Sequence, residues 1–274
     1  MDIDLTIDPV SVSQALADFL RTGITRTGLR RAVVNLSGGL DSAVSCVITA
    51  SALGPENVLA LRLPYKSSSK DSLDDAQRVI DLTGVRSVTI PISPMVDPLI
   101  ESDPEMSPVR KGNIMARMRM IIAYDRSAAF NAIVVGTGNK TEILLGYTTL
   151  YGDSACGINP LGDLYKTQVR QLARSIGIPE PILSKPPSAD LWAGQTDEGE
   201  LGYTYADVDR LLFLLVEKSF RPEDCVQAGF QEAFVRQVIE RIHKNEYKRL
   251  LPPIARLSNR TVGYDSLELH DWGN

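Results

Sequence analysis

A serine and two glycines followed by an aspartate stand near the start of the chain, in VVNLSGGLDSAVSCVI, residues 33–48. Gly38 and Gly39 permit positive φ angles and let a ligand approach the backbone closely. A helix that begins directly after them would offer unpaired N–H groups and a partial positive charge. Ser37 and Ser42 add hydroxyl donors. These residue types in this order predict an anion site that suits a phosphate or a pyrophosphate.

Asp41 is the unusual residue of this loop, because a carboxylate beside a phosphate repels it unless a cation bridges the two. Mg²⁺ held between Asp41 and phosphate oxygens meets that requirement. The loop matches neither the GxxxxGKS/T pattern nor GxGxxG. From the residues alone a plainer role stays open, in which Asp41 and Ser42 only cap the first turn of the helix.

Strands and helices alternate along the first half of the chain and must position this loop. Apolar and β-branched runs predict strands at residues 31–36, within 54–64, at 87–92 and at 131–138. Helical periodicity and end signals predict helices at residues 10–20, from Leu40 onward, at 70–84 and at about 108–130. This alternation predicts an α/β fold, a doubly wound and mainly parallel sheet with helices on both faces. Since ligands bind beyond the carboxyl ends of such strands, the loops after Leu36, Leu63 and Val135 should share one crevice.

The long helix at about 108–130 presents two different faces. Arg110, Asn113 and Arg117 share one polar stripe, which either faces a ligand or lies in solvent. The opposite face carries the apolar residues Ile114, Met118 and Ile121. We expect that apolar face to be buried.

The composition is that of a globular protein and argues against several classes of function. With 43% hydrophobic and 23% charged residues, a chain of 274 residues buries an ample core. No apolar run reaches the ~18–20 residues of a membrane span, and the acidic N-terminus is unlike a signal peptide. The net charge of −5 disfavours a nucleic-acid partner. We therefore expect a cytoplasmic protein with neither a membrane nor a nucleic-acid partner.

Cysteine and histidine are scarce. Cys46, Cys156 and Cys225 are widely spaced and form neither a disulfide framework nor a metal-binding pair. His243 and His270 are the only histidines, which argues against a zinc site. Cys156 has no histidine near it in sequence, so we expect a buried or half-buried thiol rather than a nucleophile.

The segment SGGLDS resembles the pyrophosphate loop of the ATP pyrophosphatase superfamily. Six further strings occur in the order seen in NAD synthetases: RLPYKSS, RKGNIMARMRM, GTGNKTEILLGYTTLYGD, LGDLYKTQVRQLA, KPPSADLWAGQTDEGELG and YKRLLPP. The whole set runs from residue 35 to residue 253, so the chain resembles that family over nearly its full length. The resemblance implies a Rossmann-like fold similar to that of the adenine nucleotide alpha hydrolases.

The same resemblance implies one NAD synthetase domain over residues 1–274. Its ATP pyrophosphatase core would span about 30–180, and its helical C-terminal part about 204–274. Between them, residues 185–202 are rich in Pro, Gly, Asp and Thr, which predicts a mobile loop that acts as a lid.

NAD synthetases are ligases that form a C–N bond, so the resemblance implies ATP-dependent amidation of deamido-NAD to NAD with ammonia. The nicotinate carboxylate attacks the α-phosphate of ATP, which gives an NAD-adenylate and pyrophosphate. Ammonia then attacks the activated carbonyl, and AMP leaves. The resemblance also implies Mg²⁺ as cofactor, with ATP as co-substrate, and a homodimer with the long helix at or near its interface.

Individual roles follow from the resemblance at matching positions. It implies that ATP is bound by the loop residues Asn35, Leu36, Ser37, Gly38, Gly39, Leu40, Asp41 and Ser42, and by Arg62, Thr137, Lys166 and Ser188. The implied catalytic residues are Asp41, Glu142 and Lys166, with Asp41 and Glu142 as the metal ligands. Deamido-NAD would be contacted by Arg117, Tyr247 and Lys248. Asp197 and Glu198 either orient ammonium or substrate, or are solvated acids of the loop.

Three positions depart from the pattern of common stand-alone bacterial members. Leu150 stands in place of a lysine, Gly157 in place of an acid, and Tyr247 in place of a histidine. All three lie on the dinucleotide side, and they resemble the synthetase domain of glutamine-dependent NAD synthetases. We therefore expect a stand-alone member that uses free ammonia or a separate amide-donor protein.

Two other functions compete with this interpretation. A tRNA-modifying ATP pyrophosphatase would be expected to show a basic groove and often paired cysteines, and the sequence shows neither. A nucleotide-binding module without turnover would not need Asp41, Glu142 and Lys166 together. That second alternative stays open until binding and pyrophosphate release are measured.

Overall fold

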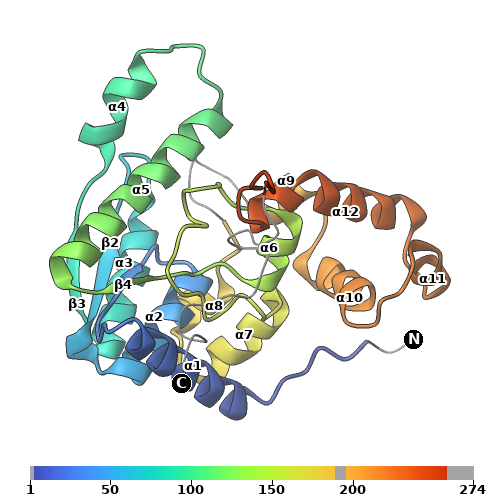
Figure 1. The fold of residues 1–274 in the computed structure, drawn as a ribbon, viewed down its shortest axis with the longest axis horizontal. Coiled ribbons are helices and arrows are strands. Elements are labelled where there is room, and N and C mark those ends of the chain that lie inside the picture. Colours follow the sequence, from blue (N-terminus) through green and yellow to red (C-terminus); the bar gives the residue numbers. More distant parts are fainter. Residues whose placement is uncertain (1–2, 189–195, 258–274) are drawn as a thin grey trace.

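The computed structural model describes residues 3–188 and 196–257 and has a parallel sheet at its centre (Figure 1). The four strands stand in the order β3-β2-β1-β4, and every pair is parallel. Their bounds are β1 Ala32–Asn35, β2 Val58–Arg62, β3 Arg86–Thr89 and β4 Ile133–Val135. The predicted α/β fold is confirmed, and the central position of β1 brings three strand ends to one edge.

Both faces of the sheet are covered by helices, because successive strand residues point to opposite sides. Val33, Leu61 and Val134 pack on one side with α4 (Ser93–Glu101) and α5 (Pro108–Phe130). Val34 and Ala60 pack on the other side. The helices of that side are α1 (Pro9–Arg26), α2 (Leu40–Leu53), α3 (Lys70–Thr83), α7 (Lys166–Ser175) and α8 (Glu180–Ser184).

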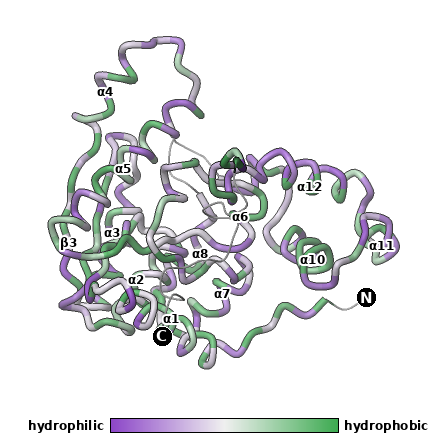
Figure 2. Tube along the Cα trace, viewed as in Figure 1, coloured by the Kyte–Doolittle hydropathy of each residue, from purple (hydrophilic) through white to green (hydrophobic). Residues whose placement is uncertain are grey.

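A second group of helices follows the sheet, from α6 and α9 near the middle of Figure 1 to α10, α11 and α12 at its right. It contains α6 (Lys140–Leu145), α9 (Asp197–Leu201), α10 (Tyr205–Val216), α11 (Pro222–Gln227) and α12 (Glu232–Lys244). These helices share their own apolar core, which includes Leu145, Leu211 and Val238. In Figure 2 the strongly apolar α10 is green, whereas α12 alternates between apolar and polar residues. Short 3-10 turns at Pro55–Asn57 and Glu246–Arg249 complete the described elements.

The structure describes part of two predicted segments in the second half of the chain. The segment predicted as a loop at 185–202 contains the short helix α9, in which Asp197 and Leu201 are buried. The part of that segment at 189–195 lies outside the described residues. The C-terminal part predicted at about 204–274 is helical as far as Arg249, and residues 250–257 form neither helix nor strand. Its remaining residues, 258–274, lie outside the described residues.

The helix α4 was not predicted from the sequence because Pro94 and Pro98 break its pattern. Pro94 lies in the first turn, where no N–H group is required. Pro98 lies inside the helix, where it removes one hydrogen bond. The helix buries Val96 against the sheet, so packing outweighs the local preference.

The buried face of α5 also differs from the expected one. Met115, Ile122 and Ala123 are buried, whereas Ile121 is 54% exposed. Ile114 and Met118 are only half-buried. Apolar residues occur on nearly every side of this helix, so its periodicity is weak and does not select the face that packs.

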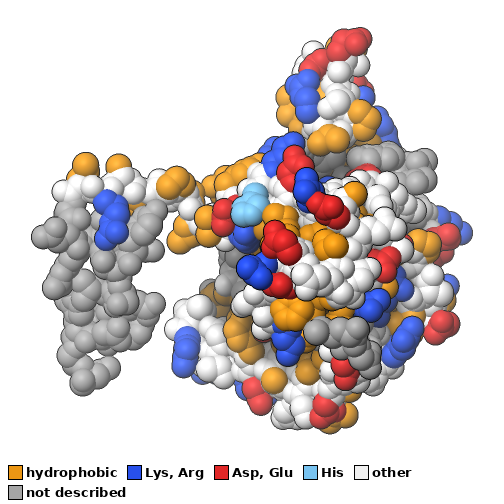
Figure 3. Space-filling model, turned by 90° about the vertical axis from the view of Figure 1, so that its right-hand side faces the viewer, with side chains coloured by type: hydrophobic (Ala, Val, Ile, Leu, Met, Phe, Trp, Pro, Cys, Tyr) orange, Lys and Arg blue, Asp and Glu red, His pale blue; other side chains and the backbone are white. Residues whose placement is uncertain are grey.

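The surface of the C-terminal helices carries charges of both signs. Figure 3 shows Lys and Arg side chains interspersed with Asp and Glu across that face, without a continuous basic region among the described residues in view. Within residues 3–188 and 196–257, no helix is long and apolar enough to cross a membrane.

Candidate active site

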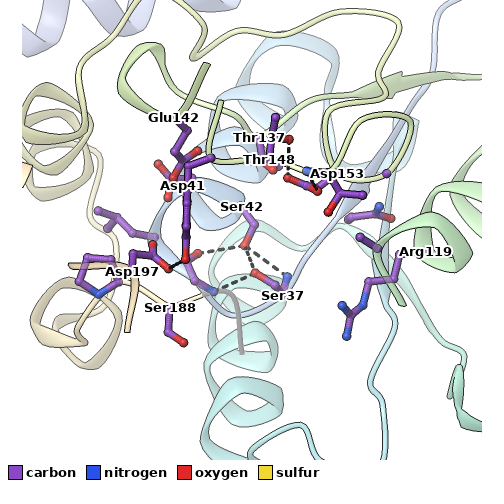
Figure 4. A pocket seen from close by; sticks show the side chains of 18 of the residues that line it. Ser37, Asp41, Ser42, Arg119, Thr137, Glu142, Thr148, Asp153, Ser188 and Asp197 are labelled. Atoms are coloured by element: carbon purple, nitrogen blue, oxygen red, sulfur yellow. Dashed lines mark hydrogen bonds between the residues drawn. The ribbon is translucent and has the colours of Figure 1, made fainter. Parts of the chain in front are cut away.

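A cavity of about 510 Å³ lies beyond the carboxyl ends of β1, β2 and β4. Leu36, Leu63 and Thr137, which follow these three strands, line it. The prediction that the three loops share one crevice is therefore confirmed. Figure 4 shows Asp41, Glu142 and Asp197 on one side of this cavity, and Arg119 and Asp153 on the other.

The loop between β1 and α2 is held in shape by its two serines (Figure 4). The Ser37 backbone N–H donates to Ser42 Oγ at 3.2 Å, and the Gly39 N–H donates to Ser37 Oγ at 3.2 Å. Ser42 Oγ in turn donates to the Gly39 carbonyl at 2.9 Å. Gly39 is the N-cap of α2 and has no side chain, so the first N–H groups of that helix are left for a ligand. Asp41 and Ser42 do not act as its caps.

Gly38 is required by the backbone of this loop. Its φ of +85° is rarely adopted by other residues, and an added Cβ would lie 2.1 Å from the Ser72 carbonyl oxygen. We expect Gly38→Ala to lower the free energy of unfolding by about 2 kcal/mol or more, measured by urea unfolding.

Gly39→Ala is the matched control, because Gly39 has a φ of −87° and its added Cβ would meet only Ser37 Oγ at 3.4 Å. Its expected loss is below about 1 kcal/mol. Equal losses in the two variants would contradict the argument from backbone conformation.

Lys166 joins the two carboxylates that the sequence proposed as catalytic. Its Nζ donates to Asp41 Oδ2 at 2.5 Å and to Glu142 Oε1 at 3.1 Å, and the residue is only 3% exposed. Asn139 orients both acids, since its Nδ2 donates to Asp41 Oδ1 at 3.0 Å and its backbone N–H donates to Glu142 Oε2. Three segments distant in sequence thus place one cation and two anions at the cavity wall.

Burial sets the protonation of this cluster. Burial raises the pKa of Glu142 to about 7; Lys166 opposes this rise and Asp41 adds to it. Burial by itself would lower the pKa of Lys166, but the adjacent Asp41 and Glu142 carboxylates outweigh it and raise that pKa. Lys166 is therefore a permanent cation at neutral pH, whereas Glu142 can gain or lose a proton.

Asp209 of α10 holds the start of α7, from which Lys166 projects. It is fully buried, and its carboxylate accepts from Thr141 Oγ1 at 2.5 Å and from the Thr167 N–H at 2.8 Å. The Lys166 N–H donates to the same Thr141 hydroxyl. Asp209 was not found from the sequence, where its only signal is an acid within an apolar helix.

The remaining residues proposed for ATP line the same cavity. Arg62 lines it while its Nη1 donates to Gln77 Oε1 at 2.7 Å, and Thr137 and Ser188 line it as well. The cavity is also lined by Asn35, Leu36, Ser37, Gly39, Leu40, Asp41 and Ser42 of the loop. Gly38 does not line it but lies against Ser72.

Asp41 and Glu142 are the carboxylates beside the loop that could hold a hard cation. Neutral oxygens of residues such as Asn35, Ser37 and Ser42 also line the cavity. Asp41 and Glu142 bind the same Nζ atom, so their oxygens lie close together. Among the described residues, no group of three or more His, Cys, Asp or Glu side chains forms a metal cage. Two carboxylates fit Mg²⁺ that arrives with phosphates, because that ion usually takes one or two carboxylates and fills its other positions with phosphate oxygens and water.

Comparison with known proteins decides the family. The family model described as NAD synthase matches residues 12–252 of this chain. The chain belongs to the NAD synthase family. An NH(3)-dependent NAD(+) synthetase from Chlorobium phaeobacteroides (strain DSM 266 / SMG 266 / 2430) is 49% identical over 270 residues, which cover 98% of each chain. The family resemblance inferred from the sequence is thereby confirmed.

Solved structures of two synthetases have a similar fold. An NMN synthetase from Francisella tularensis is 32% identical with a TM-score of 0.82, and the match covers 92% of this chain and 100% of that one. An NH3-dependent NAD synthetase from Campylobacter jejuni is 31% identical with a TM-score of 0.78, over 91% and 100% of the two chains.

In this member of the NAD synthase family, one of the three residues proposed to bind deamido-NAD lines the cavity and two do not. Lys248 lines the cavity, and its Nζ donates to the Gly146 and Thr148 carbonyls. Arg117 is exposed, does not line the cavity, and donates from Nε to the Leu150 carbonyl. Tyr247 is 60% exposed and does not line it either. Their contacts with the dinucleotide stay predictions.

Four basic residues that the sequence did not single out line the cavity: Arg119, Arg170, Lys185 and Arg241. Arg119 lies on α5 and donates from Nε to the Leu63 carbonyl at 3.0 Å. With Asn113 and Ala116 it forms the face of that helix that lines the cavity. The spacing of three residues between these positions is the signal that could have found it.

A smaller cavity of about 280 Å³ adjoins the first and shares Thr137, Glu142 and Lys248 with it. Cys156 lines this smaller cavity, and burial raises the pKa of its thiol. Gly157 lies nearby, where an added Cβ would lie 2.5 Å from Ile133 Cγ1. A side chain at this position would therefore have to displace Ile133.

Proposed function

We propose that this enzyme amidates deamido-NAD to NAD with ammonia and ATP, through an NAD-adenylate. The observation that carries the proposal is the buried Lys166, held between Asp41 and Glu142 beside a helix N-terminus that is open to an anion. The names of its relatives, NH(3)-dependent NAD(+) synthetases at 45–49% identity over most of the chain, support it. Pyrophosphate release distinguishes this enzyme from a module that only binds nucleotides.

In the first step a carboxylate oxygen of the nicotinate ring attacks the α-phosphorus of ATP, and the bond from that phosphorus to the bridging oxygen breaks. Pyrophosphate leaves with the electron pair. The loop N–H groups around Gly39 hold the phosphates, and the Lys166 ammonium stabilises the charge that develops on the leaving group.

In the second step ammonia attacks the acyl carbon of the adenylate and loses a proton. The bond from that carbon to the AMP oxygen breaks, and AMP leaves with that oxygen. The cavity walls must exclude water, because water would hydrolyse the adenylate back to the acid.

Mg²⁺ belongs to this proposal as the cofactor that arrives with ATP. Asp41 and Glu142 would hold it together with phosphate oxygens. When bound it would neutralise phosphate charge and make the α-phosphorus more electrophilic. The same acids hold Lys166 between them, which keeps their oxygens near one another.

The proposal is tested by measuring which acceptor the enzyme amidates and which amide product it forms. The purified chain is supplied with ATP, Mg²⁺ and ammonium, together with either deamido-NAD or nicotinic acid mononucleotide, and the amide products are quantified. NAD formed from deamido-NAD supports the proposal. A clear preference for the mononucleotide would instead favour the activity named for the Francisella neighbour.

The nitrogen source is tested in the same assay. Glutamine replaces ammonium in a parallel reaction. We expect product with ammonium alone, because the relatives are named for ammonia. Product with glutamine only would point to an amide-donor function that the proposal does not include.

The raised pKa of Glu142 predicts a pH dependence. Because the pKa of Glu142 is about 7 in the free enzyme, its neutral acid form predominates below that pH. Only its carboxylate form attracts Mg²⁺ and Lys166. We expect kcat/KM for ATP to rise as the pH increases through about 7 and then to level off. Free ammonia, rather than total ammonium, is held constant during the titration.

Glu142→Gln is the control for this profile. The variant should be slower and should lose the limb near pH 7, because its amide does not titrate. A limb that is unchanged in Glu142→Gln would assign the titration to another group.

We also propose a homodimer that works in the cytoplasm. Helix α5 leaves Val109, Ile121 and Tyr124 exposed, which supports an interface along it. The three cysteines are free thiols, in keeping with a reducing compartment. Sedimentation at micromolar concentration is expected to give a dimer, and a monomer throughout would contradict this part of the proposal.

A further inference from the structure

We propose that Tyr205 is a positioning residue for the reaction: its ring face fixes the Lys166 ammonium and its hydroxyl fixes Asp197. This inference rests on the proposed function of the cavity. Tyr205 is the first residue of α10 and is only 2% exposed. It therefore connects the second group of helices with the catalytic lysine of α7.

The ring contact completes the surroundings of the lysine. Lys166 Nζ lies 5.1 Å from the centroid of the Tyr205 ring, an attractive cation–π geometry. Asp41 and Glu142 accept two of the three N–H donors of the ammonium. A ring face restrains the cation without supplying a strong acceptor, so the third donor stays available to a phosphate oxygen.

The hydroxyl contact holds an acid of the cavity wall. Tyr205 Oη donates to Asp197 Oδ2 at 3.2 Å, and Asp197 is only 4% exposed although it lines the cavity. Tyr147 Oη also approaches Asp197, at 3.1 Å from Oδ1, but it lies 2.9 Å from Glu200 Oε2 as well. A hydroxyl has one proton, so Tyr147 divides it between Asp197 and Glu200. Tyr205, by contrast, donates its proton to Asp197 only.

The backbone of Tyr205 fixes the direction of its ring. Its N–H donates to Glu198 Oε1 at 2.8 Å, so an acid of α9 holds the start of α10. Glu198 does not line the cavity, and this contact gives it a structural role. Helices α7, α9 and α10 thus meet at one tyrosine, and removal of its ring should loosen Lys166 without removing the lysine.

Tyr203 is a matched control two residues earlier in the chain. It packs in the same apolar core, with its ring centroid 5.3 Å from that of Phe234. Its buried hydroxyl has no hydrogen-bond partner among the described residues, and it does not line the cavity. Apart from a charge interaction with Arg241, changes at Tyr203 therefore measure the cost of lost packing.

The experiment compares Tyr205→Phe and Tyr205→Met with Tyr203→Phe and Tyr203→Met. Each full-length variant is assayed for kcat and for KM with ATP, and its stability is measured by urea unfolding. Tyr205→Met should lower kcat by about 10- to 30-fold with a smaller change in KM, because Lys166 acts mainly on the leaving pyrophosphate. Tyr205→Phe keeps the ring and should lose only about 5-fold.

Both Tyr203 variants should stay within about 2-fold of wild-type kcat. This should hold even where their stability falls as much as that of the corresponding Tyr205 variants. Equal losses of kcat in Tyr205→Met and Tyr203→Met would assign the effect to packing and overturn the proposal. Wild-type kcat in Tyr205→Met would overturn it too. A Tyr205→Met chain that does not fold is replaced by Tyr205→Leu, read against Tyr203→Leu.

Failure of the proposed function gives a different result. A wild-type chain that makes no NAD from deamido-NAD contradicts that function but leaves the role of Tyr205 testable. Binding of labelled pyrophosphate with Mg²⁺ is then compared by equilibrium dialysis, because pyrophosphate is the leaving group on which Lys166 acts. Weaker binding in Tyr205→Met than in Tyr203→Met supports the positioning role, and equal binding overturns it.

Discussion

Lys166→Met is expected to lower kcat for NAD formation by about 10²- to 10³-fold, the usual loss when a preorganised group that stabilises developing charge is removed. Methionine keeps most of the apolar stem and removes the ammonium. The loss also leaves Asp41 and Glu142 without the cation that both contact. The measurement is kcat with saturating ATP, deamido-NAD and ammonium, and pyrophosphate release in a single turnover.

Lys140→Met is the matched control for this experiment. Lys140 lies at the start of the neighbouring helix α6, binds Asp163 at 2.9 Å, and does not line the cavity. Its replacement should change kcat by no more than about 3-fold. If the kcat of Lys166→Met lies within about 3-fold of wild type, as expected for the control, Lys166 has no role in the chemical step.

Asp41→Asn is expected to lower turnover by about 10²-fold or more while the fold stays intact. The amide has the same shape, but it has no charge with which to hold Mg²⁺ or to pair with Lys166. Turnover is followed as a function of Mg²⁺ concentration, and circular dichroism checks the fold. Because Asp41 raises the pKa of Glu142, the variant should also shift the pH limb of Glu142 downward.

The exposed Asp71 on α3 serves as control for the loss of one negative charge. Asp71→Asn should leave turnover and its Mg²⁺ dependence unchanged. If Asp41→Asn keeps a near wild-type rate at every Mg²⁺ concentration, the metal role assigned to Asp41 is wrong.

The loop chemistry could be predicted from the sequence because it is local. Gly38 needs a positive φ, and Ser37 and Ser42 bond within five residues of each other. The strand ends that share the cavity follow from the alternation of strands and helices alone. Such features depend on short stretches of chain, which the sequence displays directly.

Features that depend on distant partners could not be predicted in this way. Asp209 accepts a hydrogen bond from the N–H of Thr167, which lies 42 residues earlier in the chain. The ring of Tyr205, on another helix, contacts the Lys166 ammonium. Nothing near Asp209 or Tyr205 in the sequence indicates these contacts. On α5, the weak periodicity favoured Arg117, whereas packing turned Arg119 to the cavity.

The central claim is that the acceptor carboxylate attacks the α-phosphate of ATP, and isotope transfer tests it most directly. Deamido-NAD labelled with ¹⁸O in its nicotinate carboxylate is converted with unlabelled ATP and ammonium, and the AMP is analysed by mass spectrometry. The account predicts one ¹⁸O atom in the phosphate group of AMP, carried over when the acyl carbon–oxygen bond breaks. AMP without label, or label found in inorganic phosphate, would contradict it.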